Sequence, residues 1–215
     1  LRIDHPDVLE FITAKRTPGR WNNFNVSVAV SDEFMQAVQN DLTWQLVHKA
    51  RPGDALLSNG LTQRVDGQWI YAEVSARDIW QIVMQSAYDF AEPGILFLDN
   101  INRDNNLAYC ETLEATNPCG EQPLPPYGCC DLGPVILPKF VRHPFGLDGS
   151  APGFDFEAFV QAVFTQVRVL DNVLDLTHWP LPEQAMEAAA KRRIGVGFTG
   201  LGDALVMLNL PYNSD

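Results

Sequence analysis

The sequence predicts an α/β fold, because stretches rich in β-branched or apolar residues alternate along the chain with stretches of helical periodicity. A strand is expected over residues 24–30, where polar and apolar side chains alternate. Residues 76–90 carry apolar side chains at helical spacing. The apolar stretch 95–98, which follows the turn residues Pro93-Gly94, predicts a second strand.

Two shorter helices are expected near the start of the chain. The first runs from Pro6 to about Lys15, with Asp4 as its N-cap and proline in its first turn. The second begins after Ser31, whose hydroxyl suits an N-cap, and ends near Gln39. Both precede or follow the strand over 24–30, which agrees with the alternation of an α/β protein.

The middle of the first half is rich in turn residues. Residues 50–73 predict a surface excursion, in which 62–65 and 68–72 form a hairpin closed by an Asp-Gly turn. Ser75 is expected to cap the helix that follows. The asparagine-rich stretch 99–107 is predicted to be a loop.

The second half is predicted to be mainly helical. A turn-rich connection over 144–153 leads to the longest helix, at about 155–176. A helix over 182–194 and a last one from about Thr199 complete the chain. No composition shift marks a boundary, so residues 1–215 are treated as a single partial domain.

The match to G-x-G-x-x-G over Gly195–Gly200 does not predict a dinucleotide site. That fingerprint needs a strand directly before it and an acidic residue about twenty positions later. Here a helix is expected to end at Ile194, and the chain stops at Asp215. We interpret the glycines as a close-packed connection between helices, and we expect neither NAD nor FAD.

Composition narrows the classes of partner. The formal net charge of −12 disfavours binding to a nucleic-acid polymer, although it leaves nucleotides possible. No apolar run reaches the length of about 18 residues that spans a bilayer. The chain opens on Leu1 without a signal pattern, so a piece of a longer protein is expected. Four cysteines without a secretion signal predict reduced thiols in the cytoplasm.

Residues 117–121, Asn-Pro-Cys-Gly-Glu, place a thiol, a carboxylate and an amide within five positions. Cys119, between proline and glycine, is expected at a loop tip. If the segment is extended, Asn117 and Glu121 share a face with the thiol. Glu121 suits a general base, and Asn117 can orient hydroxyl groups. The alternatives are a buried structural cysteine, a solvated carboxylate and a turn-forming asparagine.

A zinc site is the competing explanation for the cysteines. Cys110, Cys119, Cys129 and Cys130 contain no pair at the usual ligand spacing, and adjacent thiols rarely bind one tetrahedral ion. We therefore expect no metal.

The run 116–133 strongly resembles the active-site loop of ribonucleotide reductases. Its segment 117–124, Asn-Pro-Cys-Gly-Glu-Gln-Pro-Leu, is most similar to the adenosylcobalamin-dependent class II enzymes, because radical-subunit-dependent relatives more often have leucine at Pro118. The resemblance extends from His5 to Ser214. It implies an α/β fold that is part of a ten-stranded barrel, with the motif on a central finger loop.

The resemblance also implies roles for the motif. Cys119 would become a thiyl radical that abstracts the 3′ hydrogen of a ribonucleotide, while Glu121 accepts the 3′-hydroxyl proton and Asn117 orients the ribose. Cys130, eleven residues after Cys119, would be one member of the reducing thiol pair, with its partner outside this chain. Cys129 would face the other way, and Cys110 would be structural.

Two other segments are interpreted through the family. Where relatives have Ser-Ile-Asn-Leu, this chain has Pro134-Val-Ile-Leu; proline cannot donate a ladder hydrogen bond, which bears on how Cys130 is held. The basic loop 15–23 would link an effector site to the substrate base, with Arg20, Trp21 and Asn22 in contact. Composition alone would make this loop a solvated turn.

The expected function is therefore reduction of ribonucleotides by a thiyl radical generated with adenosylcobalamin, whose corrin-binding residues are not recognisable in this chain. The implied partners are a ribonucleotide, deoxynucleotide effectors, a thioredoxin-like reductant and a second copy in a homodimer. The isolated piece should be inactive. The alternatives are a class I large subunit that uses a separate metal-radical subunit, and a non-catalytic nucleotide-binding or thiol-regulated module.

Overall fold

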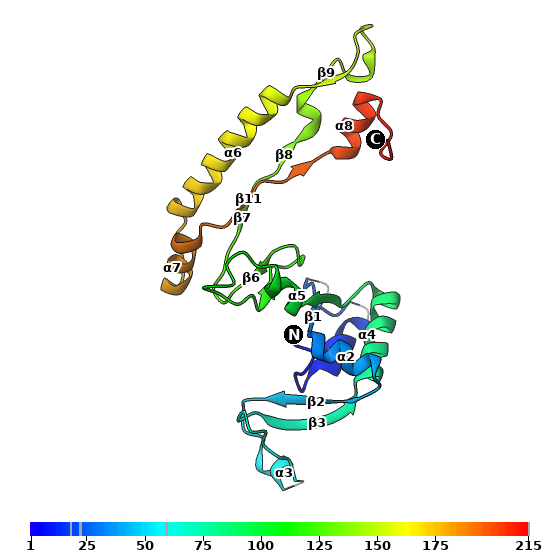
Figure 1. Ribbon diagram of the computed structural model, residues 1–215, viewed down its shortest axis with the longest axis vertical. Coiled ribbons are helices and arrows are strands. Elements are labelled where there is room, and N and C mark those ends of the chain that lie inside the picture. Colours follow the sequence, from blue (N-terminus) through cyan, green and yellow to red (C-terminus); the bar gives the residue numbers. More distant parts are fainter. Residues whose placement is uncertain (18, 22, 59, 215) are drawn as a thin grey trace. The chain divides into compact units, whose positions relative to one another are not determined.

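A computed structural model describes residues 1–17, 19–21, 23–58 and 60–214 (Figure 1). The chain forms two compact units, residues 1–126 and residues 127–215. Each is described by itself. Among the described residues, no helix is both long and apolar enough to cross a membrane.

The first unit holds the parallel pair that the alternation of helices and strands predicts. Its helices are α1 (Val8–Thr13), α2 (Asp32–Gln39), α3 (Asp54–Leu57), α4 (Ala76–Phe90) and α5 (Leu98–Arg103), with a 3₁₀ turn at Ala14–Arg16. Its strands are β1 (Ser27–Val30), β2 (Thr43–His48), β3 (Trp69–Ser75), β4 (Gly94–Phe97), β5 (Ala115–Thr116) and β6 (Pro123–Leu124). β1 pairs with β4 in parallel, with Ser27 opposite Gly94.

Apolar side chains from β1 and from three helices form the core of this unit. α4 packs against α1 and α2. Val28 of β1, Val8 of α1, Phe34 of α2 and Val83 of α4 are fully buried. The aromatic ring of Phe34 also meets Trp44 of β2 edge-on, with 5.2 Å between the ring centroids. Removal of these side chains from water is the main stabilising contribution to this unit.

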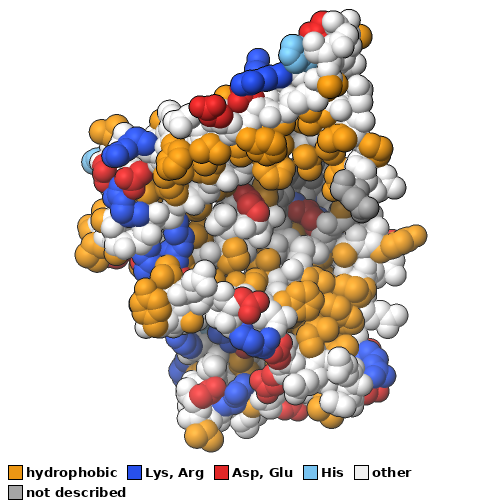
Figure 2. All heavy atoms as spheres, turned by 45° about the horizontal axis from the view of Figure 1, so that its top comes forward, with side chains coloured by type: hydrophobic (Ala, Val, Ile, Leu, Met, Phe, Trp, Pro, Cys, Tyr) orange, Lys and Arg blue, Asp and Glu red, His pale blue; other side chains and the backbone are white. Residues whose placement is uncertain are grey.

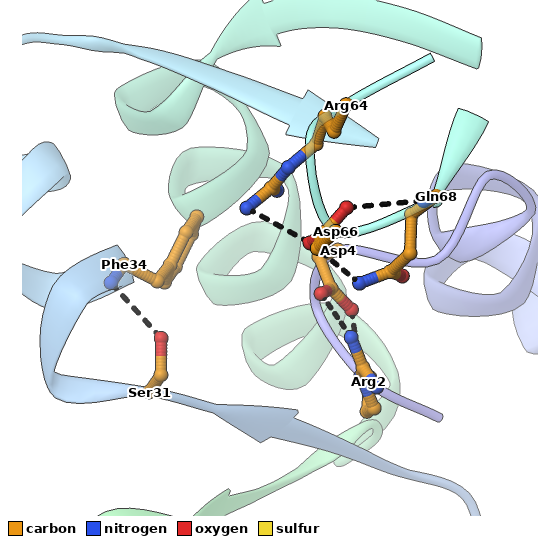
Figure 3. Close-up of polar contacts among 7 residues, drawn as sticks. All are labelled: Arg2, Asp4, Ser31, Phe34, Arg64, Asp66 and Gln68. Carbon is orange, nitrogen blue, oxygen red and sulfur yellow. Dashed lines mark hydrogen bonds and ion pairs between the residues drawn. The ribbon is translucent and has the colours of Figure 1, made fainter. Parts of the chain in front are cut away.

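Two of the predicted helix caps in this unit are confirmed. The hydroxyl oxygen of Ser31 accepts from the backbone N–H of Phe34 at 3.1 Å, and that of Ser75 accepts from Asp78 at 3.2 Å. The predicted cap at Asp4 is wrong. α1 begins at Val8, and the Asp4 carboxylate instead forms an ion pair with Arg2, as Figure 3 shows together with the Ser31 cap.

The expected hairpin over 62–72 is only partly present. The turn forms, since the Arg64 N–H donates to the Gln68 carbonyl at 2.7 Å and the Asp66 carboxylate binds both Gln68 and Arg64 (Figure 3). The main partner of β3, however, is β2, in an antiparallel pair with an irregularity between Leu46 and Val47. Figure 1 shows these two strands as a ribbon with α3 beyond its end. The local turn thus forms as predicted, but it does not supply the main partner of β3.

The loop expected over 99–107 is also corrected, because it begins as helix α5. Asn102 on this helix explains its place in the unit. Its side-chain oxygen accepts from the Leu113 N–H at 2.7 Å, and its amide donates to the Leu113 carbonyl at 2.9 Å. These two bonds hold the buried Leu113, which lies just before the strand β5 that carries the cysteine motif.

The second unit contains the long helix that the periodicity predicts. α6 runs over Phe156–Leu176 and is capped by Asp155, which accepts from the Ala158 N–H at 3.0 Å. It is followed by α7 (Pro182–Lys191) and α8 (Leu201–Leu208). The other elements are the strands β7 (Asp131–Leu132), β8 (Val135–Ile136), β9 (Val141–Arg142), β10 (Gly153–Phe154), β11 (Ile194–Gly195) and β12 (Phe198–Thr199), and the 3₁₀ turns Leu137–Phe140 and Pro144–Gly146.

The glycine-rich segment 195–200 is not a plain connection between helices, which corrects the prediction. β11 pairs in parallel with β7, and β12 pairs in parallel with β8. A Cβ on Gly195 would lie 2.4 Å from a methyl carbon of Leu132, so the Leu132 side chain fills the space that a side chain on residue 195 would need. Gly195 therefore serves packing beside the Cys129-Cys130 segment.

Candidate active site

The cysteine motif forms the connection of a small hairpin in the first unit. β5 and β6 pair antiparallel, with Thr116 opposite Pro123. The connection is closed by backbone bonds, because the Asn117 N–H donates to the Gln122 carbonyl at 3.2 Å and the Gly120 N–H donates to the Asn117 carbonyl at 3.1 Å. Gly120 has φ +86°, a left-handed conformation that glycine adopts without steric cost. The prediction of a cysteine at a loop tip is confirmed.

The carboxylate and the amide of the motif meet within this turn. The side-chain amide of Asn117 donates to Glu121 Oε1 at 2.5 Å, and its oxygen accepts from the Gln122 N–H at 3.0 Å. The expectation of an extended segment is therefore wrong, since the chain reverses direction here. Asn117 and Glu121 are brought together by the turn and not by a shared face of an extended segment. Their hydrogen bond orients the exposed carboxylate of Glu121.

Cys119 is exposed at the tip of the hairpin. Its Sγ lies 3.8 Å from the side-chain nitrogen of Asn25, which comes from the segment just before β1. A structural cysteine is usually buried among apolar side chains. The exposure of this thiol thus favours the reactive alternative over the structural one.

A cavity of about 790 Å³ borders the hairpin within the first unit. One wall is the segment 114–118, which ends in Asn117 and Pro118 of the motif. The other walls come from α1 and from the segment between α1 and β1, including Arg20, Trp21 and Asn25. This volume lies in the range of small-molecule sites, so a nucleotide-sized ligand can be accommodated.

An ion pair supports the part of the cavity wall that contains Asn25. Lys15 and Glu92 form a contact in which their side chains are only 14% and 23% exposed. Lys15 also donates to the Phe24 carbonyl, and Glu92 accepts from the Val26 N–H at 3.3 Å. The pair therefore holds the backbone on both sides of Asn25.

The predicted contact residues Arg20 and Trp21 line the same cavity. The guanidinium carbon of Arg20 lies 5.9 Å from the centroid of the Trp21 ring, and that ring meets Phe24 edge-on at 5.9 Å. All of these side chains offer flat or cationic surfaces to the cavity. The third residue of that prediction, Asn22, lies outside the described residues.

The second thiol pair belongs to the second unit. Cys129 and Cys130 are both half-buried, directly before β7. Burial raises the pKa of the Cys129 thiol, and the opposing effect of Arg193 is smaller. The fourth cysteine, Cys110, is exposed in the first unit, with its Sγ 3.5 Å from the Leu107 carbonyl, so its position gives no support to a structural role.

Pro134 does not disturb the strand that follows Cys130. The ladder bonds to the 193–197 segment are donated by Asp131, Gly133 and Val135, at 3.2, 3.0 and 3.0 Å. Alternate residues of a strand point their N–H groups in opposite directions, so the position of Pro134 donates no bond to this partner. Proline is tolerated here for the same reason that it is tolerated at sheet edges.

Sequence reasoning missed Asn25 and Glu92, and it gave no partner to Lys15, which lies in the basic loop 15–23. A polar side chain within the predicted strand 24–30 was the available signal for Asn25. No local pattern links Lys15 with Glu92, because the two are far apart in the chain and meet only in the folded unit.

Comparison with models of known protein families identifies the family of this chain. The model of the ribonucleotide reductase barrel domain matches residues 1–215, and the chain belongs to this family. The predicted resemblance to the ribonucleotide reductase family is thereby confirmed.

Individual relatives narrow the comparison. The chain is 37% identical, over its full length, to the vitamin B12-dependent ribonucleoside-diphosphate reductase of Thermoplasma acidophilum, of which it covers 25%. It is 35% identical to the enzyme of that name from Mycobacterium tuberculosis strain CDC 1551, of which it covers 28%. A ribonucleoside-diphosphate reductase large subunit from Arabidopsis thaliana is 28% identical over 98% of the chain. The chain thus spans roughly a quarter of the relatives that it matches.

Proposed function

We propose that the protein to which this chain belongs reduces ribonucleotides to 2′-deoxyribonucleotides by a thiyl-radical mechanism. The observation that carries the proposal is an exposed thiol at a hairpin tip beside a cavity of about 790 Å³, with a carboxylate held in the same turn. The family and the names of its relatives support the same reaction.

In this proposal the sulfur of Cys119, as a thiyl radical, takes the hydrogen atom from C3′ of the ribose. Glu121 accepts the proton of the 3′-hydroxyl, and Asn117 fixes the carboxylate through its 2.5 Å bond. The 2′-hydroxyl leaves as water with a proton from one thiol of the reducing pair, and C2′ gains a hydrogen from the other thiol. The pair supplies two electrons in total and becomes a disulfide. Glu121 returns its proton to the 3′-oxygen, and Cys119 returns the hydrogen atom to C3′, which regenerates the thiyl radical.

The class II assignment rests on the relatives named as vitamin B12-dependent, which are 35–37% identical, against 28% for the large subunit from Arabidopsis. When bound, adenosylcobalamin supplies a carbon-centred radical that can take a hydrogen atom from a thiol. The Cys119 thiol is compatible with such a hydrogen transfer, because it is exposed and not enclosed by its own loop.

Further parts of the proposal concern the rest of the protein. The two units would contribute to a ten-stranded α/β barrel with the β5–β6 hairpin as its finger loop. Cys130 would be one redox thiol, with its partner outside this chain and a thioredoxin-like protein as external reductant. Arg20 and Trp21 would contact the substrate base and respond to deoxynucleotide effectors, because both line the cavity. Binding at an effector site would then bias substrate choice.

The test is formation of deoxyribonucleotide by the full-length parent protein, with and without adenosylcobalamin, in the wild type and in Cys119→Ser. Cys110→Ser is the matched control, since Cys110 is an exposed thiol outside the motif. We expect product that requires adenosylcobalamin, disappears in Cys119→Ser and persists in Cys110→Ser. Product that requires a metal-radical partner would move the protein to class I. Nucleotide binding without product under either condition would favour a non-catalytic module.

A further inference from the structure

Asn25 is the one side chain outside the motif for which the structure describes a hydrogen bond to Cys119. Its amide nitrogen lies 3.8 Å from Sγ, within range of a bond to sulfur, and the two residues are 94 positions apart in the chain. Asn25 also lines the cavity that Asn117 and Pro118 border. The contact therefore connects the hairpin to the segment that precedes β1, which also lines the cavity.

The backbone of Asn25 is fixed from both sides. The carbonyl of Phe24 accepts from Lys15, and the N–H of Val26 donates to Glu92, while Lys15 and Glu92 pair with each other. The Val26 carbonyl in turn accepts from the Gly94 N–H at 2.9 Å, which ties the segment to β4. A side chain on a backbone held in this way loses little further freedom when it binds the sulfur.

We propose that Asn25 is a positioning residue for the Cys119 sulfur. The amide N–H donates to a lone pair of Sγ, which limits the orientations of the thiol and leaves its own hydrogen free to point elsewhere. Sulfur is a weak acceptor, so the bond orients the side chain more than it stabilises the fold. The inference rests on the proposed function, because orientation of the thiol matters only if this sulfur reacts.

The chemical reactivity of Cys119 tests the proposal without turnover. Reduced full-length parent protein is treated with iodoacetamide at one fixed pH, and the alkylation rates of the Cys119 and Cys110 peptides are followed by mass spectrometry. The alkylation rate depends on the groups that surround the reacting sulfur, so it responds to a contact with Sγ. Three variants are compared with the wild type: Asn25→Leu, similar in size without a donor; Asn25→Asp, similar in shape with an acceptor only; and Asn25→Gln, which keeps the donor.

We expect alkylation of Cys119 to slow by about two- to threefold in Asn25→Leu, the lower end of what loss of one neutral hydrogen bond produces, because sulfur is a weak acceptor. Asn25→Asp should slow it at least as much, because it adds a negative charge, and Asn25→Gln should restore part of the rate. The rate at Cys110 should stay constant in all three. In the activity assay, kcat should fall with little change in KM.

Unchanged alkylation of Cys119 in both Asn25→Leu and Asn25→Asp would overturn the proposal. Should Asn25→Leu fail to fold, as a changed Cys110 rate would reveal, Asn25→Asp alone decides. A slowed Cys119 in a protein that forms no deoxyribonucleotide would uphold the contact and reject the proposed function. Unchanged alkylation of Cys119 in the Asn25 variants of an enzyme that forms deoxyribonucleotide would reject the contact and uphold the proposed function.

Discussion

The two units differ in how they hold their cysteines. The first unit contains the motif hairpin and has a continuous core. Helices α1, α2 and α4 and strand β1 all contribute fully buried side chains to this core. In the second, α6 buries Leu170 and Leu174 but exposes seven apolar side chains: Phe156, Val160, Phe164, Val167, Val169, Val173 and Leu176. Figure 2 shows many apolar side chains gathered at the surface of the molecule.

The difference shows that the two thiol segments are held in place by different kinds of interaction. Cys119 depends on side-chain burial and on one ion pair, which fix the wall beside its hairpin. Cys130 depends on short parallel backbone pairing, β7 with β11, and on a glycine that permits close approach. Four substitutions test this contrast.

The largest effect is expected from Phe34→Ala in the core of the first unit. Phe34 is fully buried, and truncation of a buried phenylalanine costs about 3–5 kcal/mol through lost burial and the cavity left behind. Phe164→Ala on α6 is the control, because Phe164 is 69% exposed, and it should cost less than about 1 kcal/mol. Urea unfolding of the 215-residue chain, to which these exposed fractions apply, measures both. Equal losses of unfolding free energy in the two variants would contradict the contrast between the units.

Lys15→Met should have the next largest effect. It leaves Glu92 without its cation in a site where both side chains are mostly buried, which we expect to cost about 2–3 kcal/mol, somewhat below the value for a fully buried pair. The double variant Lys15→Met with Glu92→Gln should recover part of the loss, because no unpaired charge remains. A double-variant cycle on unfolding free energies measures the coupling. A coupling near zero would show that the pair does not support the cavity wall.

Gly195→Ala should destabilise the second unit by about 1 kcal/mol, the lower end of overpacking costs, since its Cβ would lie 2.4 Å from the end of the Leu132 side chain, which must shift. Gly197→Ala is the matched control, because a Cβ there meets nothing within 4 Å. Hydrogen exchange at the amides of residues 131–135 localises the effect. Faster exchange in Gly195→Ala alone is expected, and equal behaviour of the two variants would contradict the role of close approach.

The smallest effect concerns pH. The N–H of Ala158 and, to a lesser extent, the Arg142 guanidinium lower the pKa of the Asp155 carboxyl below its ordinary value of 3.8. A lowered pKa in the folded state contributes stability above the ordinary value, and this stability is lost as the pH falls through the folded-state pKa. Asp155→Asn keeps a capping oxygen but cannot titrate, so its thermal midpoint should fall less than that of the wild type between pH 5 and about pH 2. Parallel curves would contradict the assignment.

Local features of the fold were predictable because their causes lie within a few residues. Ser31 and Ser75 each accept a hydrogen bond from an N–H three positions later, so these caps can be recognised in the sequence. The prediction for Asp4 failed because the competing partner, Arg2, satisfied its carboxylate instead. The partner of β3 was missed because a nearby Asp-Gly turn suggested a closer one.

The sequence by itself determined the chemistry of this protein: a thiol between proline and glycine, a carboxylate two positions later, and a motif specific to one family. The tertiary structure alone decided which groups surround that chemistry. It brought Asn25 to Cys119, paired Lys15 with Glu92, and made a turn of a segment that was expected to be extended. The reason is that contacts between distant residues form only when the whole core has packed, whereas the residue types of a motif are already present in the chain.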